Sequence, residues 1–363
     1  MKHYHLDRSD DTVIHLQTRG IQAPKHATFS LLAQYPDANV VTIGGMYFET
    51  RKFFDRLKYM LFQGPDVLTI SEPNPEVIRK YILKAAESNK PTIVLADPIE
   101  SFDLQKLENT DFQKVMRLHQ IQTILETAAQ SFKGDVPFFL VSDITNTGGV
   151  FQIFDKAKPI IQGSNVNVVA VQSLYKFFEY GWDTTSLGAL IGHGHAFVAK
   201  GEGSLDERMI VALNLLNLGP GISEFALMPP LNSDYIQYRA KRITRNTSVI
   251  LNILKEKIGN NIELSHPSLR TEEIDRAAFV EFLGPYFFIK MPDEASASKV
   301  EKFIKAQTNE HLGYIDYGSS FGYDTTRLER FGDIIRVSTG TEDICHITFT
   351  AYRLSQMLRD ALE

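Results

Sequence analysis

Apolar residues along the chain gather in short runs, and amphipathic stretches separate these runs. The runs are rich in β-branched residues and predict buried strands at residues 39–43, 67–70, 92–96, 136–141, 166–171 and 187–191, with a further short strand at 12–16. Between the strands, apolar residues recur at helical spacing. This spacing predicts one helix that begins near Pro24 and three more at 49–61, 75–88 and about 112–129. This alternation is typical of a mostly parallel sheet with helices on both faces, so the predicted fold class is α/β.

The second half of the chain has a different arrangement. Helices are predicted at 204–217, 234–258, 295–307 and 344–362, and strands at 279–282, 286–291 and 334–337. We therefore expect an N-terminal arm (1–11), a large domain (12–230), a connecting helix (231–258) and a small C-terminal α/β domain (259–363). The length of 363 residues supports two domains, because a single core rarely grows so large. The basic side chains of the connecting helix are expected to face solvent or another subunit: Arg239, Lys241, Arg242 and Arg245.

Composition narrows the class of protein. The net charge of −6 and the absence of a long basic run argue against a nucleic-acid partner. No run approaches the ~18 apolar residues of a membrane span, and residues 1–11 lack the apolar core of a secretion signal. The single cysteine, Cys345, excludes an intrachain disulfide and a cysteine-based metal cluster. These features lead us to expect a cytoplasmic protein.

Lys176 lies between the predicted strands 166–171 and 187–191. Ammonium groups are rarely buried without a partner, so this position needs an explanation. One interpretation is a lysine at the end of a strand whose amine reaches water. The other is a lysine that links covalently to pyridoxal phosphate (PLP). That cofactor also needs a carboxylate for its ring nitrogen and N–H groups for its phosphate.

Other polar residues follow predicted strands, where ligands of parallel sheets bind. Asp97 and Asp143 each come directly after an apolar run. Asp143 is the candidate partner of the PLP ring nitrogen, and its alternative role is to cap the following loop through an Asx-turn. Arg336 carries a planar guanidinium suited to a substrate carboxylate. Its alternative role is an ion pair with Glu342 or Asp343.

Four segments give the chain a resemblance to a known family, the fold-type I PLP enzymes of Cys/Met metabolism (cystathionine γ-synthases and γ-lyases). They are residues 141–145, 173–176 with 188–192, 219–225 and 336–343. The last is close to the family's Arg-x-Ser-x-Gly-x-Glu-Asp and is the most specific. The resemblance runs with gaps from about residue 20 to the C-terminus. It implies a PLP-dependent transferase-like fold whose large domain binds the cofactor.

The resemblance also assigns roles to single residues. Cofactor-binding roles fall on Lys176, Asp143, Tyr47, Ser173, Tyr175, Gly20, Ile21 and Thr145, and catalytic roles on Lys176 and Tyr47. The N–H groups of 20–21 would bind the phosphate, although an ordinary turn is the alternative. Tyr47 would stack on the ring or simply pack, and Tyr175 would reach the phosphate or pack. Substrate-binding roles fall on Arg336, Ser320 and Tyr323.

Some positions depart from the family pattern. Glu100 stands where the family has an asparagine that contacts the cofactor's phenolic oxygen, and a carboxylate there would repel a phenolate. The family's N-terminal Tyr-x-Arg motif cannot be placed, because Tyr4 and Arg8 are wrongly spaced; Arg19 is a candidate replacement. The histidines of 193–195 are expected in a surface turn rather than at a metal, because a third ligand is missing.

Together these observations lead to one expected function and two alternatives. We expect PLP-dependent elimination or replacement at Cβ or Cγ of a sulfur-containing or O-activated amino acid, in a homodimer or homotetramer. The first alternative is an aminotransferase or decarboxylase with the same fold. The second is a non-catalytic binding subunit, which the shortened N-terminal region and Glu100 favour.

Overall fold

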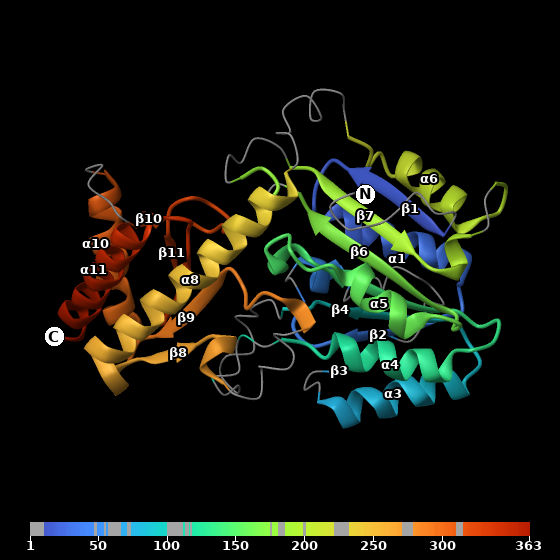
Figure 1. The fold of residues 1–363 in the computed structure, drawn as a ribbon, viewed down its shortest axis with the longest axis horizontal. Helices are drawn as coiled ribbons and strands as arrows, with labels where there is room; N and C mark the ends of the chain where they lie inside the picture. The colour runs from blue at the N-terminus through green and yellow to red at the C-terminus, as the bar shows by residue number, and fades with distance from the viewer. Residues whose placement is uncertain are drawn as a thin grey trace.

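The chain contains two β-sheets and a long helix between them, α8 (Ser233–Ile258) (Figure 1). The computed structural model describes residues 11–46, 49–53, 56, 67–70, 74–99, 112, 116, 118–174, 176–180, 186–198, 201–220, 232–270, 279–309 and 315–363. The strands of the first sheet come from residues 12–193 and those of the second from residues 263–338. The expected α/β class is confirmed. The exact domain boundaries stay a prediction.

Within the described residues, the first sheet has seven strands. In spatial order they are β1 (Thr12–Gln17), β7 (Gly188–His193), β6 (Val166–Ser173), β5 (Phe138–Asp143), β4 (Thr92–Ala96), β2 (Asn39–Ile43) and β3 (Val67–Ile70). Strands β6 to β3 run parallel, whereas β7 is antiparallel to both β6 and β1. Parallel neighbours require crossover connections, and helices supply most of them.

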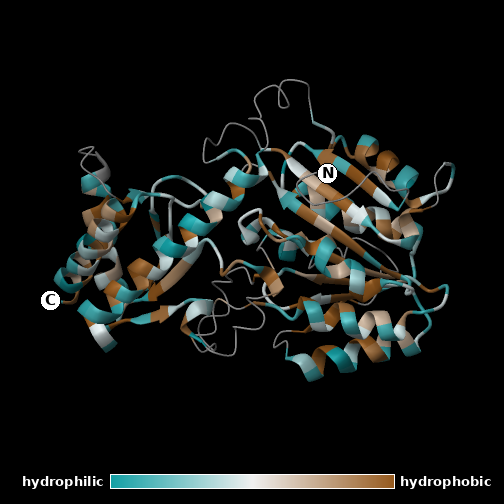
Figure 2. Ribbon diagram, in the orientation of Figure 1, coloured by the Kyte–Doolittle hydropathy of each residue, from teal (hydrophilic) through white to brown (hydrophobic). Residues whose placement is uncertain are grey.

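Helices cover both faces of this sheet. Helices α1 (Gln22–Gln34) and α6 (Leu205–Leu215) pack on one face, and α3 (Pro75–Glu87), α4 (Ile121–Ser131) and α5 (Ile153–Ile161) pack on the other. Alternate residues of one strand enter different cores: Phe139 packs with α1, and Phe138 packs with α4. Because both faces are buried, the strands are apolar along their whole length, as Figure 2 shows for the central strands.

The second sheet is smaller. Its strands, in spatial order, are β10 (Asp316–Tyr317), β11 (Arg327–Phe331), β12 (Ile334–Ser338), β9 (Tyr286–Lys290) and β8 (Glu263–Ser265). Helices α10 (Glu294–Asn309) and α11 (Ile344–Leu362) share a core with it and with the C-terminal half of α8. Short 3₁₀ turns complete the described chain: η4 (Thr145–Thr147), η5 (His195–Phe197), η6 (Gly259–Asn261) and η7 (Pro267–Leu269). None of the described helices is long and apolar enough to cross a membrane.

The structure corrects several predicted elements. The helix expected from about residue 112 begins only at Ile121, because Leu118 still pairs with Ile99 in an isolated β-bridge. The strand expected at 279–282 is wrong, since Glu281 has a φ of 64° that interrupts an extended chain. Helix α5 was not predicted. Its Pro159 lowers helix propensity, although four of its side chains are buried at helical spacing.

A buried histidine connects helices α1 and α6, which pack on the same face of the first sheet. His26 of α1 lies with one ring nitrogen 2.9 Å from the amide nitrogen of Gln17 and the other 2.7 Å from the carbonyl oxygen of Met209 in α6. Burial lowers the pKa of His26 from 6.5 to about 4, although the bond to Met209 opposes this change. The neutral imidazole is therefore the form that the fold accommodates.

We predict that His26 makes the fold sensitive to acid. Its pKa is lower in the folded chain, so the unfolded chain binds more protons between pH 6.5 and about 4. The stabilisation is complete above pH 6.5 and is lost as the pH falls toward 4. Urea unfolding should show a loss of roughly 2 kcal/mol from this group between about pH 7 and about pH 5. In His26→Gln the loss of unfolding free energy between these two pH values should be smaller by this amount. An unchanged loss would show that His26 is not the group responsible.

Candidate active site

The carboxyl ends of three neighbouring strands bring polar residues together. Asp97 follows β4, Asp143 ends β5 and Ser173 ends β6. The Asp143 N–H donates to Oδ1 of Asp97 at 3.2 Å. The Ser173 N–H donates to Oγ1 of Thr145 at 2.9 Å. These residues lie at the same edge of the sheet, which is where the parallel strands place a ligand site.

The Asp143 carboxylate is held by the turn that follows it. Its Oδ1 accepts hydrogen bonds from the Thr145 N–H at 2.9 Å and from the Thr145 hydroxyl at 2.5 Å. Burial raises the pKa of Asp143, and the bonds from Thr145 act in the opposite direction. Both bonds use one oxygen, so Asp143 caps the loop and, within the described residues, keeps its other oxygen available for a ligand. The capping role and the cofactor role are thus compatible.

Lys176 contacts the second half of the chain. It follows β6 by three residues and is half-buried. Its Nζ donates to Oγ of Ser320 and lies 5.2 Å from the centre of the Phe321 ring. The next glycine of that loop, Gly322, packs so closely that a Cβ would lie 2.6 Å from the Lys176 carbonyl oxygen. Its amine therefore points to the 320–322 loop, as a site lysine would, and does not simply extend to water.

The two segments expected to bind a phosphate are in contact. A Cβ added to Gly20 would lie 2.5 Å from Cβ of Ser173 and 2.7 Å from its Oγ, so only glycine fits there. Ile21 is the N-cap residue of α1, whose first turn has neither a side-chain cap nor an acidic residue. The positive end of the helix dipole therefore lies beside the Ser173 hydroxyl, an arrangement that favours an anion. Arg19, next to Gly20, is exposed.

Arg336 of β12 contacts the start of the loop that packs on Lys176, at Ser319. One guanidinium nitrogen, Nη2, donates to the Ser319 carbonyl oxygen and forms a 2.7 Å ion pair with Oε2 of Glu329. The expected alternative pair with Glu342 or Asp343 is wrong, since the carboxylate partner is Glu329 on the adjacent strand. Burial raises the pKa of Glu329, and Arg336 opposes the rise. The buried Nε of Arg336 has no hydrogen-bond partner within the described residues.

The acidic residues of the 336–343 segment have structural roles. Asp343 caps α11 by accepting from the N–H groups of Cys345 and His346 at 2.9 and 3.0 Å. Glu342 accepts from the Thr326 N–H, and its pKa is raised by burial. The segment therefore combines a candidate substrate-binding arginine with the start of the C-terminal helix.

Several expectations need correction or fall outside the structure. Tyr323 is only 8% exposed and packs under the Arg327 guanidinium, 3.4 Å from the ring centre, which favours a packing role. His193 does not lie in a surface turn: it is buried at the end of β7, 3.1 Å from the Thr12 hydroxyl. His195 is exposed, as expected. Outside the described residues lie Tyr4, Arg8, Tyr47, Glu100, Tyr175 and residues 221–225 of the 219–225 segment.

Sequence reasoning missed three contributors to the site. The Asn146 amide donates to the Tyr286 hydroxyl at 3.3 Å, and the Tyr286 ring packs 5.6 Å from Phe321. The Arg336 guanidinium lies 5.5 Å from the same Tyr286 ring. Asn146 stands next to Thr145 in the strand-end motif, which was a usable signal. Phe321 lies between Ser320 and Tyr323, which were assigned to the substrate, whereas nothing local marked Tyr286, because it resembles an ordinary core aromatic.

Solved structures share this architecture. The metB protein of Corynebacterium glutamicum matches with a TM-score of 0.67 at 14% identity, over 96% of this chain and 80% of its own. A cystathionine gamma synthase from Xanthomonas oryzae pv. oryzae, solved with aminoacrylate and cysteine, matches with a TM-score of 0.66 at 14% identity, over 96% and 82%. The apo form of a methionine gamma lyase from Micromonospora echinospora gives 0.63 at 16%, over 95% and 80%.

The chain has the fold of these enzymes. The PLP-dependent transferase-like fold expected from the four sequence segments is thereby confirmed. No protein-family model and no curated protein sequence matches the chain. Because the identities are 14–16%, the likeness is one of fold.

Arg239 of α8 holds the loop over Lys176. Its side chain is 1% exposed and donates to the Gly322 carbonyl oxygen at 2.8 Å and to Asp324. The expectation that it faces solvent or another subunit is therefore wrong. Lys241, two residues further along α8, is exposed.

We predict that Arg239→Met destabilises the protein, because it removes the Arg239 donor from the Gly322 carbonyl oxygen and leaves Asp324 with its bond from the Thr341 hydroxyl. The free energy of unfolding should fall by about 2–4 kcal/mol in urea titrations, whereas Lys241→Met should change it by less than about 0.5 kcal/mol. Equal effects from the two variants would refute this role.

Proposed function

We propose that the protein binds PLP at Lys176 and uses it for elimination or replacement at Cβ or Cγ of an amino acid. The supporting observation is the convergence at one sheet edge of a lysine, a half-buried carboxylate and a glycine–serine contact beside a helix N-terminus. These groups fit a covalently linked aldehyde, a ring nitrogen and a phosphate in turn. The neighbouring structures named as cystathionine gamma synthase and methionine gamma lyase support this reaction class.

The electrostatics of the site also suit PLP. Burial raises the pKa of Asp143, and a cationic ring nitrogen beside it would lower that pKa again. Asp143 would therefore be ionised when the cofactor is bound. The absence of a side chain at residue 20 lets Ser173 pack against the α1 N-terminus, so the Ser173 hydroxyl and the N–H groups of that helix end can bind the same phosphate.

When bound, PLP supplies an electron sink for negative charge at the substrate's α-carbon. Lys176 would remove the proton from that carbon as a general base and return it at a neighbouring carbon as a general acid. The Ser320 hydroxyl accepts the hydrogen bond from Lys176 and so orients its amine. Arg336 would bind the substrate carboxylate, in competition with Glu329. Burial already raises the pKa of Glu329, so this carboxylate is protonated more easily. A protonated Glu329 would release Arg336 to the substrate.

We predict that Lys176→Ala abolishes covalent PLP binding. The purified wild-type protein with added PLP should show the visible absorbance band of the lysine-bound cofactor, and this band should be absent in Lys176→Ala. Lys84→Ala, which removes an exposed lysine of α3, is the matched control and should keep the band. An equal band in Lys176→Ala would contradict the proposal.

The products formed by the purified protein distinguish this function from the alternatives. Elimination or replacement should release a thiol or an O-linked leaving group from sulfur-containing or O-acylated amino acids. Carbon dioxide release would indicate a decarboxylase, and accumulation of pyridoxamine phosphate an aminotransferase. Failure to hold PLP at a stoichiometric level would favour the non-catalytic binding subunit.

We also propose that the chain forms a homodimer or homotetramer. Leu215 of α6 is 79% exposed, and Ile210, Val211 and Leu216 beside it are 44–47% exposed, so a second copy could bury this surface. Light scattering should give two or four times 41.1 kDa. Leu215→Asp should shift the protein toward smaller species, whereas Leu83→Asp, at an exposed position of α3, should not. A monomeric wild-type protein would rule the proposal out.

A further inference from the structure

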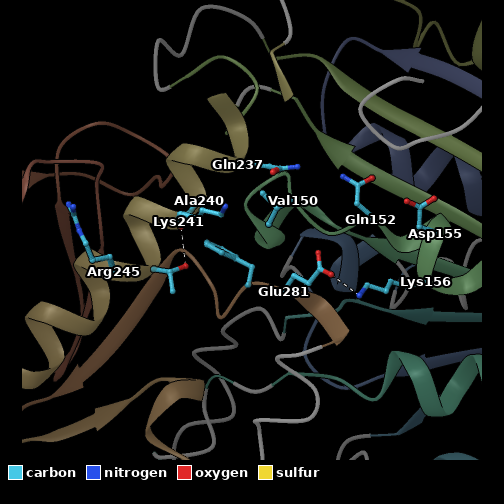
Figure 3. A pocket seen from close by; sticks show the side chains of 11 residues that line it. Val150, Gln152, Asp155, Lys156, Gln237, Ala240, Lys241, Arg245 and Glu281 are labelled. Atoms are coloured by element: carbon cyan, nitrogen blue, oxygen red, sulfur yellow. Dashed lines mark hydrogen bonds and ion pairs between the residues drawn. The ribbon is translucent and has the colours of Figure 1, made fainter. Parts of the chain in front are cut away.

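A cleft of about 760 Å³ lies between the N-terminus of α5 and one side of α8 (Figure 3). This volume is in the range of small-molecule sites. Gln152 and Lys156 line it from the α5 side, Gln237 and Lys241 from α8, and Glu281 and Phe282 from the segment before β9. No residue that we assign to the candidate active site is among those that line it.

Closely packed side chains border the cleft. A Cβ on Gly148 would lie 3.1 Å from the Phe282 ring, and a Cβ on Gly149 would lie 2.9 Å from Ile236 and 3.3 Å from Phe178. Both glycines have a positive φ, 68° and 71°, which lets the loop pass between these side chains. Because the residues that line the cleft differ from those of the candidate active site, we treat it as a second site.

Gln152 is the strongest sign of a ligand. Its side chain is only 8% exposed, and neither the nitrogen nor the oxygen of its amide has a hydrogen-bond partner within the described residues. Gln152 is the N-cap residue of α5, yet its side chain does not cap the helix. Buried amides almost always have partners, so a donor and an acceptor on a bound molecule would satisfy this one.

The charges around Gln152 are mixed. Lys241 is exposed, and none of the described residues forms an ion pair with it. Figure 3 shows Gln237 and Lys241 extending from α8 toward Gln152, whereas Arg245 points away and donates to Asn246 at 2.7 Å. Lys156 is paired with Glu281 at 2.7 Å. One cation is thus available for a carboxylate, beside the positive end of the α5 dipole.

Carboxylates at the cleft argue against a multiply charged anion. Asp155, in the first turn of α5, and Glu281 both line the cleft and would repel a phosphate dianion. A carboxylate has several acceptor sites, so the same two groups can also accept from an ammonium, even though Glu281 is already paired with Lys156. The Phe282 ring, together with Val150 and Ala240, provides an apolar wall. A ligand with one carboxylate, one ammonium and an apolar side chain satisfies all of these features.

We propose that this cleft binds a small zwitterion, an α-amino acid with an apolar side chain. Its carboxylate lies between Lys241 and the Gln152 amide nitrogen, and its ammonium donates to the Gln152 amide oxygen and the neighbouring carboxylates. This site is independent of whether PLP binds at Lys176.

Isothermal titration of the full-length protein with L-leucine tests the proposal, because leucine carries no leaving group at Cβ or Cγ. L-leucine should bind, and Gln152→Leu and Lys241→Met should each weaken its Kd about tenfold or more. Gln152→Leu should unfold at a temperature no lower than the wild type, because it removes an unsatisfied buried amide. Lys255→Met, at an exposed position of the same helix, should bind like the wild type.

Three results would overturn the proposal. The first is no heat of binding with L-leucine. The second is binding that Gln152→Leu leaves unchanged or that Lys176→Ala abolishes, which would place leucine in the active site instead. The third is binding of 4-methylpentanoate, which lacks the ammonium, as tightly as L-leucine, which would make the cleft an anion site. If the wild-type protein shows no PLP band, the proposed function fails, but these three tests of the cleft remain valid.

Discussion

A buried guanidinium connects three parts of the molecule that are far apart in the sequence. Arg239 lies in the N-terminal half of α8 and is bonded to the Gly322 carbonyl oxygen and to Asp324. Asp324 in turn accepts from the Thr341 hydroxyl at 2.6 Å. Because a buried arginine needs acceptors for its N–H groups, these bonds determine where the 320–324 loop lies. Gly322 then packs on Lys176, so the helix between the two sheets positions the closing side of the site.

The opposite side of the site comes from the topology of the parallel sheet. Parallel strands β4, β5 and β6 all end at one edge, and the turn after each of them carries a polar group. Thr145 links two of these turns, since its hydroxyl both donates to Asp143 and accepts from the Ser173 N–H. The α1 N-terminus reaches the same edge through Gly20. A carboxylate and a helix N-terminus are therefore held on rigid elements, while the lysine is held by the second sheet's loop.

The segment from Thr145 to Lys156 lies between the two sites. It begins at the Asp143 turn, passes the closely packed side chains at Gly148 and Gly149, and ends in the first turn of α5 at the cleft. Helix α8 contributes to both sites as well, through Arg239 on one side and Gln237 and Lys241 on the other. A molecule bound in the cleft would contact the same helix and loop that support the candidate active site.

The sequence by itself determined the positions of the strands, because buried parallel strands are apolar on both faces and leave continuous apolar runs. It also determined that Asp143 and Ser173 follow such strands, and the parallel topology then requires them to meet. Its four motifs predicted the fold. Local pattern failed where another effect was stronger, as at Pro159 in α5 and the positive φ of Glu281.

Only the tertiary structure decided which charged groups are buried and which partners they have. Arg239 and Lys241 stand in one basic cluster, yet one is buried and the other exposed. Arg336 pairs with Glu329 across two adjacent strands rather than with its sequence neighbours. Ser320 meets Lys176 across 144 positions of the chain. Such contacts depend on how distant segments pack, and the pattern of nearby residues carries no information about that packing.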